Sequence, residues 1–537
     1  MAPTLSILLS LLLGQFALAT TPSPPTTHCT NLTPPSLPGL TLLSFTTNPL
    51  LNHTVPATPP FLPVSVPNLT LCEVNIALNH PPANDTVNIQ LWLPLTPTAW
   101  NDRFLALGGS AWAAGLGPFS LAPYAAQGFA TGSTDAGVGF APLSPAGWAI
   151  KADGTVDKVL LENFAGRAVH ELAVVGKAVT EKYYGRKPGH AYWNGCSTGG
   201  RQGVVAAQRY PGDFDGIVAG APAVYWTRYL VAELWPQVVM REVGYYPTLC
   251  ELQGVRGEVV RECDALDGVG DGVISELGKC TFGVEKLVGR KVACGGKEVE
   301  ITAKLVEVVK RIWEGPKTAD GKRLWYGLNR GAPLETLAAT HEANGTTVGD
   351  PFFVAQDWVR YFVKTNPTFD LSGLDSAGLR QLFDESVAKL AAAIDSSDPN
   401  LSGFQQAGGK LLMWHGEADN IIFPQDSIQY RDEVQKTLGL TSRRVDDFFR
   451  LFIAPGVDHC GQGTIDGAAP TDPLGALINW VEKKKAPQEL AGATLSTAKT
   501  QFTRKLCPYP LVAKYDGHGD PTNAESFQCA KGCKRSE

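Results

Sequence analysis

Residues 195–199 read Gly-Cys-Ser-Thr-Gly, which places two nucleophilic side chains next to each other. A serine with glycines two residues before and two residues after it is the pattern of a nucleophile elbow, a tight turn between a strand and a helix. The flanking sequence fits, because 191–195 predicts a short buried strand and 201–210 a helix. The pattern favours Ser197 as the nucleophile of an acyl-transfer reaction over a plain glycine- and serine-rich turn.

A serine nucleophile needs a histidine base and an acid that orients it, and after an elbow these follow in the order serine, acid, histidine. Four histidines follow Ser197 in the chain. His459 comes directly after the last predicted strand, 448–456, where such a base is expected. His415 ends an apolar strand and is interpreted as a core histidine. The other two lie in an insertion and in a glycine-rich tail.

The orienting acid is predicted at Asp419, in the stretch HGEADNII that follows the apolar strand 409–416. At the carboxyl edge of a parallel sheet this position lies beside the end of the next strand. Asp426 and Asp458 are competitors. Asp458 adjoins His459 in sequence, which disfavours a contact with the ring nitrogen, so Asp419 is preferred to both.

The cysteine beside the serine has a counterpart beside the histidine. Cys196 precedes Ser197 and Cys460 follows His459. If the serine and histidine meet, two cysteines at that separation form a disulfide in an oxidising compartment. Closing so long a loop stabilises the fold by about 4–5 kcal/mol in the chain-entropy model. The alternative, Cys196 as nucleophile, is disfavoured because the residue before an elbow serine points away from the apex and oxidation would silence the thiol.

Composition narrows the class of protein. The chain has 537 residues, 44% hydrophobic and 18% charged, with a formal net charge of −6. These values describe an ordinary globular protein and give no reason to expect nucleic-acid binding. Residues 1–19 have a short apolar core and end in Ala-Leu-Ala, which predicts a signal peptide, with a membrane anchor as the alternative. No later segment has the roughly 18 apolar residues of a membrane span.

Two further features predict secretion and an extracellular location. The chain has 11 cysteines, an unusual number for a cytosolic enzyme. The odd total leaves one thiol over, for which Cys533 in the Lys-rich tail is the candidate. Six Asn-x-Ser/Thr sequons predict N-glycosylation on a secreted surface; they lie at Asn31, Asn52, Asn68, Asn84, Asn344 and Asn400.

The order of apolar segments predicts an α/β fold. Short apolar strands alternate with helices up to about residue 224 and again from about 406, which indicates a mainly parallel sheet covered on both faces. A large insertion at 225–405 interrupts this domain, which therefore comprises 20–224 and 406–537. Within it, the Pro- and Thr-rich stretch 20–67 predicts an irregular arm on the surface.

Four stretches carry a family resemblance: GCSTGGRQG, QRYPGDFDGIVAGAPA, HGEADNII and PGVDHC. Together they resemble the fungal tannase and feruloyl esterase family, in particular its feruloyl esterase B-like members, and the match covers about 60–515. The resemblance implies an α/β-hydrolase fold whose insertion is a lid domain. It also implies hydrolysis of phenolic acid esters by Ser197 as nucleophile, His459 as base and Asp419 as acid.

The resemblance also implies where the oxyanion hole lies. One N–H would come from Thr198 and the other from the loop at Gly108 and Gly109. This chain departs from the family there, because it reads GGSAWAAG where relatives have more glycine, and Val138 stands where many relatives have a histidine. These departures concern the pocket rather than the three catalytic side chains.

An aspartate-rich loop in the insertion predicts a metal site. Residues 263–274 read CDALDGVGDGVI, with carboxylates at Asp264, Asp267 and Asp271. Hard oxygen ligands on a short loop suit Ca²⁺, although the spacing is not that of an EF-hand and an Asp-Gly turn is the alternative. The resemblance favours a structural calcium site in the lid, completed by the carbonyls of Val269 and Val273.

The remaining cysteines allow further disulfides. One pair flanks the aspartate loop and would hold it in place, and two more pairs are suggested. A fourth pair is possible, although no pattern supports it and this chain lacks the second cysteine that relatives have nearby. In that order the pairs are Cys263–Cys280, Cys29–Cys72, Cys507–Cys529 and Cys250–Cys294.

Together these features predict a secreted serine esterase acting on feruloyl or coumaroyl esters of plant cell-wall polysaccharides. The substrate partner is a small phenolic ester or a polysaccharide-linked one, with specificity in the lid. The alternative substrate is a galloyl ester, as for a tannase. A non-enzyme alternative, a binding module on a hydrolase fold, predicts that a triad residue is missing, and none is.

Overall fold

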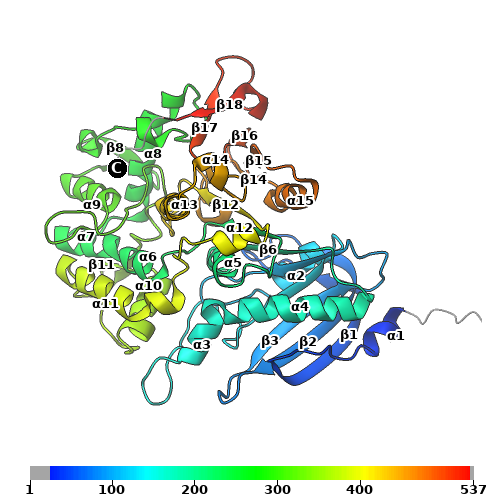
Figure 1. Cartoon of the computed structure of the whole chain (residues 1–537). Helices are drawn as coiled ribbons and strands as arrows, with labels where there is room; N and C mark the ends of the chain where they lie inside the picture. The colour runs from blue at the N-terminus through cyan, green and yellow to red at the C-terminus, as the bar shows by residue number, and fades with distance from the viewer. Residues whose placement is uncertain (1–24, 533–537) are drawn as a thin grey trace, which may run out of the picture.

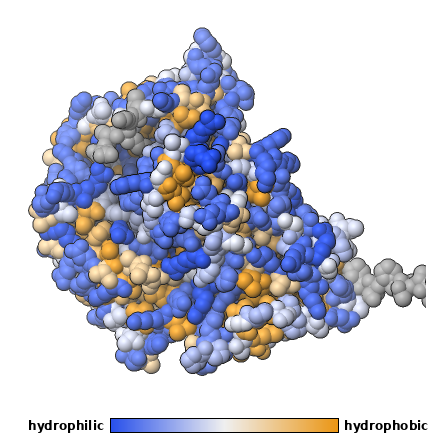
Figure 2. All heavy atoms as spheres, in the orientation of Figure 1, coloured by the Kyte–Doolittle hydropathy of each residue, from blue (hydrophilic) through white to orange (hydrophobic). Residues whose placement is uncertain are grey.

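The computed structural model describes residues 25–532 (Figure 1). The predicted signal peptide at 1–19 and the candidate free thiol, Cys533, lie outside the described residues. Between residues 25 and 532, none of the helices has the length and apolar character needed to cross a bilayer. Figure 2 shows that hydrophobic residues on the face in view form separate patches among hydrophilic ones.

A nine-stranded sheet organises the fold, in the order β1-β2-β3-β5-β4-β6-β7-β12-β13. The pairs from β1 to β5 are antiparallel, and the pairs from β5 to β13 are parallel. The predicted α/β class is confirmed. The strands are β1 (Thr41–Val55), β2 (Val66–Asn79), β3 (Val87–Pro94), β4 (Arg103–Leu107), β5 (Ala130–Thr134), β6 (His190–Cys196), β7 (Gly216–Gly220), β12 (Lys410–Gly416) and β13 (Phe449–Ala454).

Alternate strand residues point to opposite faces of this sheet, and helices cover both faces. Phe104, Trp193 and Ile217 belong to one buried cluster, whereas their neighbours Leu105 and Tyr192 belong to another. The first cluster includes residues of α4 (Ala168–Tyr184), α5 (Thr198–Arg209) and α13 (Pro424–Thr437), and the second includes residues of α2 (Pro118–Ala125) and α15 (Pro473–Lys483). Shorter helices are α1 (Pro25–Thr30), α3 (Lys158–Glu162) and α14 (Ser442–Val445).

The stretch 20–67 contains a strand where the sequence predicted an irregular arm. β1 pairs antiparallel with β2 along most of its length and forms one edge of the sheet. Most of its side chains are exposed or half-buried, and Pro49 lies within it. A proline is tolerated on an edge strand, where one row of N–H groups needs no partner. The prediction failed because an exposed edge strand lacks the buried alternation that marks a strand.

Between β7 and β12 the chain leaves the sheet, and the predicted insertion boundaries of 225 and 405 fall between these two strands. The segment is mainly helical, with two small hairpins. Its elements are α6 (Trp226–Ala232), α7 (Trp235–Val243), α8 (Leu249–Cys263), β8 (Lys291–Cys294), β9 (Lys297–Glu300), α9 (Ala303–Glu314), β10 (Thr340–Ala343), β11 (Thr346–Gly349), α10 (Phe353–Asp357), α11 (Ser376–Ile394) and α12 (Ser402–Gln406). After α15 the chain adds two small sheets, formed by β14 (Ala469–Pro470), β15 (Leu490–Ala493) and β16 (Thr503–Leu506), and by β17 (Leu511–Tyr515) and β18 (Phe527–Lys531).

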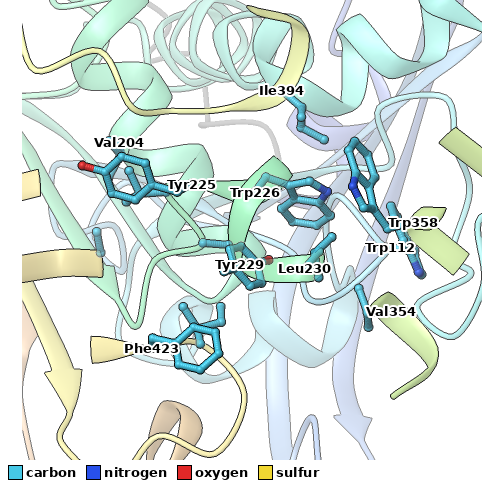
Figure 3. Packing of buried hydrophobic residues seen from close by; sticks show 14 of the residues in the cluster. Trp112, Val204, Tyr225, Trp226, Tyr229, Leu230, Val354, Trp358, Ile394 and Phe423 are labelled. Carbon is cyan, nitrogen blue, oxygen red and sulfur yellow. The ribbon is translucent and has the colours of Figure 1, made fainter. Parts of the chain in front are cut away.

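Aromatic rings join the insertion to the loop after β4 (Figure 3). Trp112 of that loop lies 5.5 Å from Trp226 of α6, and Trp226 lies 6.3 Å from Trp358 (ring centroids). All three side chains are fully buried. The insertion and the sheet domain therefore share one hydrophobic core.

Candidate active site

Ser197 occupies a sharp turn between β6 and α5. Its φ of 62° lies in the left-handed region, which side chains adopt at a cost and which is a feature of functional turns. A Cβ on Gly195 would lie 2.6 Å from the carbonyl of Gly199, and one on Gly199 would lie 3.1 Å from the Cα of Gly108. The predicted elbow is present, and its two glycines are required by these close approaches.

His459 and Asp419 meet at the carboxyl edge of the same sheet. His459 follows β13, and its Nδ1 lies 2.8 Å from Oδ2 of Asp419. The other oxygen, Oδ1, accepts hydrogen bonds from the N–H groups of Ile421 and Ile422, both at 2.9 Å. Asp419 is fully buried. A carboxylate fixed by two backbone donors can hold the imidazole in one tautomer and one orientation.

The two competing aspartates have other surroundings. The carboxylate of Asp458 accepts the N–H groups of Gly463 and Thr464, at 3.3 and 2.6 Å. Asp426 is fully buried, and neither of its oxygens has a hydrogen-bond partner among the described residues. Neither side chain contacts the ring of His459, so the structure favours Asp419 as the sequence did.

The electrostatics of the Asp419–His459 pair suit a histidine base oriented by a carboxylate. Burial alone would raise the pKa of Asp419, but the facing charge of His459 and hydrogen bonds from His415 and His459 lower it well below its usual range. Burial disfavours the charged form of His459, yet the charge of Asp419 outweighs this and raises the pKa of the ring above 6.5. Burial and the nearby charge of Asp419 raise the pKa values of Glu233 and Asp426 well above normal. Asp419 is therefore the carboxylate that stays ionised.

His415 contacts Asp419, and the sequence does not predict this contact. It is fully buried, as predicted for a core histidine. Its Nε2 lies 3.0 Å from Oδ2 of Asp419, and its Nδ1 lies 2.8 Å from Oγ of Ser427. The same carboxylate oxygen is thus shared by two imidazoles. The available signal was its position at the end of β12, four residues before Asp419.

A disulfide joins Cys196 to Cys460, with Cα atoms 6.1 Å apart. It places the turn of Ser197 next to the turn of His459. No hydrogen bond joins Oγ of Ser197 to the ring of His459 within residues 25–532, and such bonds often form only when substrate binds. The other four suggested pairs are also present, including Cys250–Cys294.

Neither of the two glycines predicted as an oxyanion donor has a free N–H group, which corrects that part of the prediction. The N–H of Gly108 donates to the carbonyl of Asn194, continuing the ladder between β4 and β6, and the N–H of Gly109 donates to Oε1 of the buried Gln202 at 3.0 Å. Both donors are therefore occupied. Within residues 25–532, the N–H of Ala111 has no acceptor, and its carbonyl accepts the hydroxyl of Thr198 at 2.7 Å.

The insertion is linked to the turn of His459 by hydrogen bonds through Asn420. The N–H of His459 donates to Oδ1 of Asn420 at 3.4 Å, and the amide of Asn420 donates to Oγ1 of Thr336 at 2.6 Å. Thr336 lies within the predicted insertion. No spacing in the sequence predicts that these three residues are connected.

Comparison with known proteins identifies the family. Residues 72–530 match the family described as tannase and feruloyl esterase. The chain belongs to this family. A probable feruloyl esterase from Arthroderma benhamiae is 46% identical, covering 94% of this chain and 93% of that protein. A probable feruloyl esterase B-1 from Aspergillus fumigatus is 33% identical, with 87% of each chain covered.

Solved structures of family members share the fold. Tannin acyl hydrolase from Aspergillus niger superimposes with a TM-score of 0.84 at 28% identity, covering 94% of this chain and 95% of that one. Feruloyl esterase B from Aspergillus oryzae gives a TM-score of 0.76 at 28% identity, covering 94% and 100%. The predicted α/β-hydrolase fold is confirmed, and the chain is a carboxylic ester hydrolase.

Proposed function

We propose that the protein is a secreted serine esterase that hydrolyses feruloyl and coumaroyl esters of plant cell-wall polysaccharides. The observation that carries the proposal is the buried Asp419–His459 pair, held beside the elbow of Ser197 by the Cys196–Cys460 disulfide. The names of the two relatives, both probable feruloyl esterases, support the choice of acyl group.

In the proposed mechanism, Oγ of Ser197 attacks the ester carbonyl while Nε2 of His459 takes its proton. The tetrahedral oxyanion collapses, the C–O bond to the alcohol breaks, and His459 returns the proton to the leaving oxygen. Water then attacks the acyl-enzyme, giving a proton to His459, and the acid is released as Ser197 regains its proton. Asp419 stays ionised throughout and stabilises the imidazolium.

We propose Thr198 and Ala111 as the oxyanion donors. The N–H of Thr198 is the first of α5, where helix geometry leaves it without an intrahelical acceptor. Replacing Thr198 by valine keeps the buried shape and removes the hydroxyl that holds Ala111. We expect kcat on an aryl ester to fall about tenfold with little change in KM, less than the 10²–10³ of losing a whole donor. Thr198→Ser should restore kcat, and an unaltered kcat in the valine variant would count against Ala111.

The pH profile of the activity follows from the direction in which the pKa of His459 is shifted. The base must be neutral to accept the proton, and Asp419 raises the pKa of the ring above 6.5. Activity should therefore be lost as pH falls through this raised pKa, with the acid midpoint of kcat/KM above 6.5. Asp419→Asn should move that midpoint down and lower kcat by about 10⁴. Asp458→Asn is the matched control, and an equal movement of its midpoint would contradict the assignment of Asp419.

A galloyl ester is the second candidate substrate, because the structure of a tannin acyl hydrolase superimposes well on this chain. Comparing kcat/KM on methyl ferulate, methyl p-coumarate and methyl gallate separates the two. The proposal expects the ferulate and coumarate esters to be preferred. A preference for methyl gallate would make the enzyme a tannase, and turnover of none of them would remove both candidates.

Secretion with glycosylation is part of the proposal. Five disulfides within residues 25–532 suit an oxidising compartment. All six sequon asparagines are exposed. Expression in a fungal host would test it: the proposal expects protein in the medium, with a mass that falls on endoglycosidase treatment. Retention of unglycosylated protein inside the cell would contradict it.

We also propose a structural Ca²⁺ ion in the aspartate loop, held by Asp264, Asp267 and Asp271 with the carbonyls of Val269 and Val273. The donor set suits the ion. Burial raises the pKa of Asp271 to about 6 and also raises that of Asp267, because it disfavours the charged carboxylates. When bound, the ion would supply positive charge that favours the ionised form of these carboxylates.

In the structure, protein N–H groups already occupy some of the carboxylate oxygens of this loop. Asp271 pairs with Arg504 of β16, and Asp264 accepts the N–H of Gly272 at 2.9 Å. Among the described residues, no three His, Cys, Asp or Glu side chains gather where they could hold a metal ion. Binding therefore requires the carboxylates to change partners.

Removing calcium should lower the melting temperature. A ligand present at 100 times its Kd stabilises the native state by about 2.7 kcal/mol, so EDTA should lower Tm by a few degrees, and Ca²⁺ but not Mg²⁺ should restore it. In Asp271→Asn the effect of EDTA should be much smaller. An unchanged Tm in EDTA would mean that Arg504 and backbone donors hold the loop without metal.

A further inference from the structure

A pocket of about 470 Å³ opens on the face of the sheet that carries α2, where β2, β3 and β5 continue beyond that helix. Pockets of this size hold small ligands. Its walls combine polar strand residues with phenylalanines. The residues that matter here are Asn75, Asn88, Gln90, Ser133, Asp135, Phe119 and Phe140.

The floor of the pocket is polar because one face of the sheet changes character along the strands. Near α2 this face carries the buried Leu71 and Trp92. Further along, Asn75, Gln90 and Ser133 stand directly opposite one another on β2, β3 and β5. Side chains in such register lie on the same face at close spacing. The floor is thus a row of neutral groups that can donate and accept hydrogen bonds.

Part of this hydrogen-bonding capacity is unused. The amide of Gln90 donates to Glu73 at 2.9 Å, and the amide of Asn88 donates to Asp135 at 2.7 Å. The side chain of Asn75, opposite Gln90 on the floor, makes no hydrogen bond within residues 25–532 and is half-buried. A ligand with hydroxyl groups would find both donors and acceptors there.

Phenylalanines form the rim. The rings of Phe119 and Phe140 lie 6.0 Å apart, and Phe61 lies 6.3 and 6.2 Å from them. Phe140 is 54% exposed, although it has two aromatic neighbours against which it could be buried further. Phe61 and Phe119 are half-buried, so Phe140 is the exposed ring of this cluster, and it lines the pocket beside the polar floor.

The pocket lies on the reactive edge of the sheet. β5 and β6 both flank β4, so the pocket is two strands away from the elbow of Ser197. One loop connects the two places: the carbonyl of Gly109 accepts the N–H of Gly199 at 3.1 Å, and further along the N–H of Gly117 donates to Oγ of Ser133 at 3.3 Å. The loop after β4 therefore contacts both the elbow of Ser197 and the wall of the pocket.

We propose that this pocket binds sugar residues of a neutral glycan, the chain that carries the ester group. This inference rests on the proposed function and extends it to the alcohol side of the substrate. The polar floor supplies partners for hydroxyl groups, and the rings of Phe119 and Phe140 present faces to the C–H groups of a pyranose. No Lys or Arg lines the pocket, and Asp135 is its one ionisable side chain, which disfavours an anionic ligand.

Two variants test the site against substrates with and without sugar. Phe140→Ala and Asn75→Ala should raise KM for a feruloylated xylo-oligosaccharide about five- to tenfold and leave kcat/KM on methyl ferulate unchanged. Leu143→Ala is the matched control, because Leu143 is 71% exposed, close to Phe140 in sequence, and not part of the pocket. Equal kinetics of all three variants and the wild type on the oligosaccharide would overturn the proposal.

A binding measurement separates this inference from the proposed activity. Calorimetry with unesterified xylohexaose should show binding to the wild type and to Leu143→Ala, and five- to tenfold weaker binding to Phe140→Ala. This result would hold even if methyl ferulate proved a poor substrate, which would affect only the proposed function. Absence of xylohexaose binding to the wild type, or equal binding to Phe140→Ala, would overturn the glycan site while leaving the esterase intact.

Discussion

Ser197→Ala should abolish esterase activity while leaving the fold intact. The variant removes the attacking oxygen, so kcat on methyl ferulate should fall by a factor on the order of 10⁵–10⁶, as for other serine hydrolases in which the triad acts as a unit. The side chain makes no hydrogen bond within the described residues, so Tm should change by no more than a degree or two. Steady-state kinetics and a thermal melt measure the two effects.

The same variant decides between the two neighbouring nucleophiles. If Cys196 were the reactive atom, Ser197→Ala would keep most of its activity, and thiol reagents would inactivate the wild type. In the structure Cys196 is bonded to Cys460, which leaves no thiolate to react. Ser376→Ala, at a half-buried serine of α11 outside every sequon, is the control for a simple loss of hydroxyl and should behave as the wild type does.

The parts of the site that the sequence predicted are those fixed by local sequence. The elbow needs Gly195 and Gly199 because the turn brings backbone atoms within 3 Å or so of where a Cβ would lie, and that constraint is visible in five residues. Asp419 and His459 follow the ends of adjacent parallel strands, and strand order in such sheets is regular enough to bring them together.

The features that the sequence did not predict depend on contacts distant in sequence. Whether an N–H of the loop at Gly109 is free depends on Gln202, a helix residue far along the chain that takes it. The contact of His415 with Asp419 depends on how β12 ends. The pocket beside Phe140 depends on the register of β2, β3 and β5, which no single stretch specifies. Hydrogen-bond satisfaction is a property of the folded chain.

Removing the Cys196–Cys460 disulfide should cost both stability and activity. The bond closes a separation of 264 residues, for which the chain-entropy model gives about 5 kcal/mol. Cys196→Ala/Cys460→Ala should therefore melt well below the wild type. Below its own Tm, its kcat should still be about ten- to a hundredfold lower, because a displacement of about 1 Å between Ser197 and His459 is enough for such a loss.

A second disulfide provides the control that separates these two effects. Cys507→Ala/Cys529→Ala opens a separation of 22 residues in the C-terminal strands, for which the model gives about 3 kcal/mol. That variant should lose stability but keep its kcat at temperatures where it is folded. If both double variants kept full kcat, the bond at the active site would stabilise the fold without positioning the reacting groups. If both lost it equally, the loss would reflect general destabilisation. A selective loss at Cys196–Cys460 is expected, because among the five disulfides within residues 25–532 this one joins the turn of the nucleophile to the turn of its base.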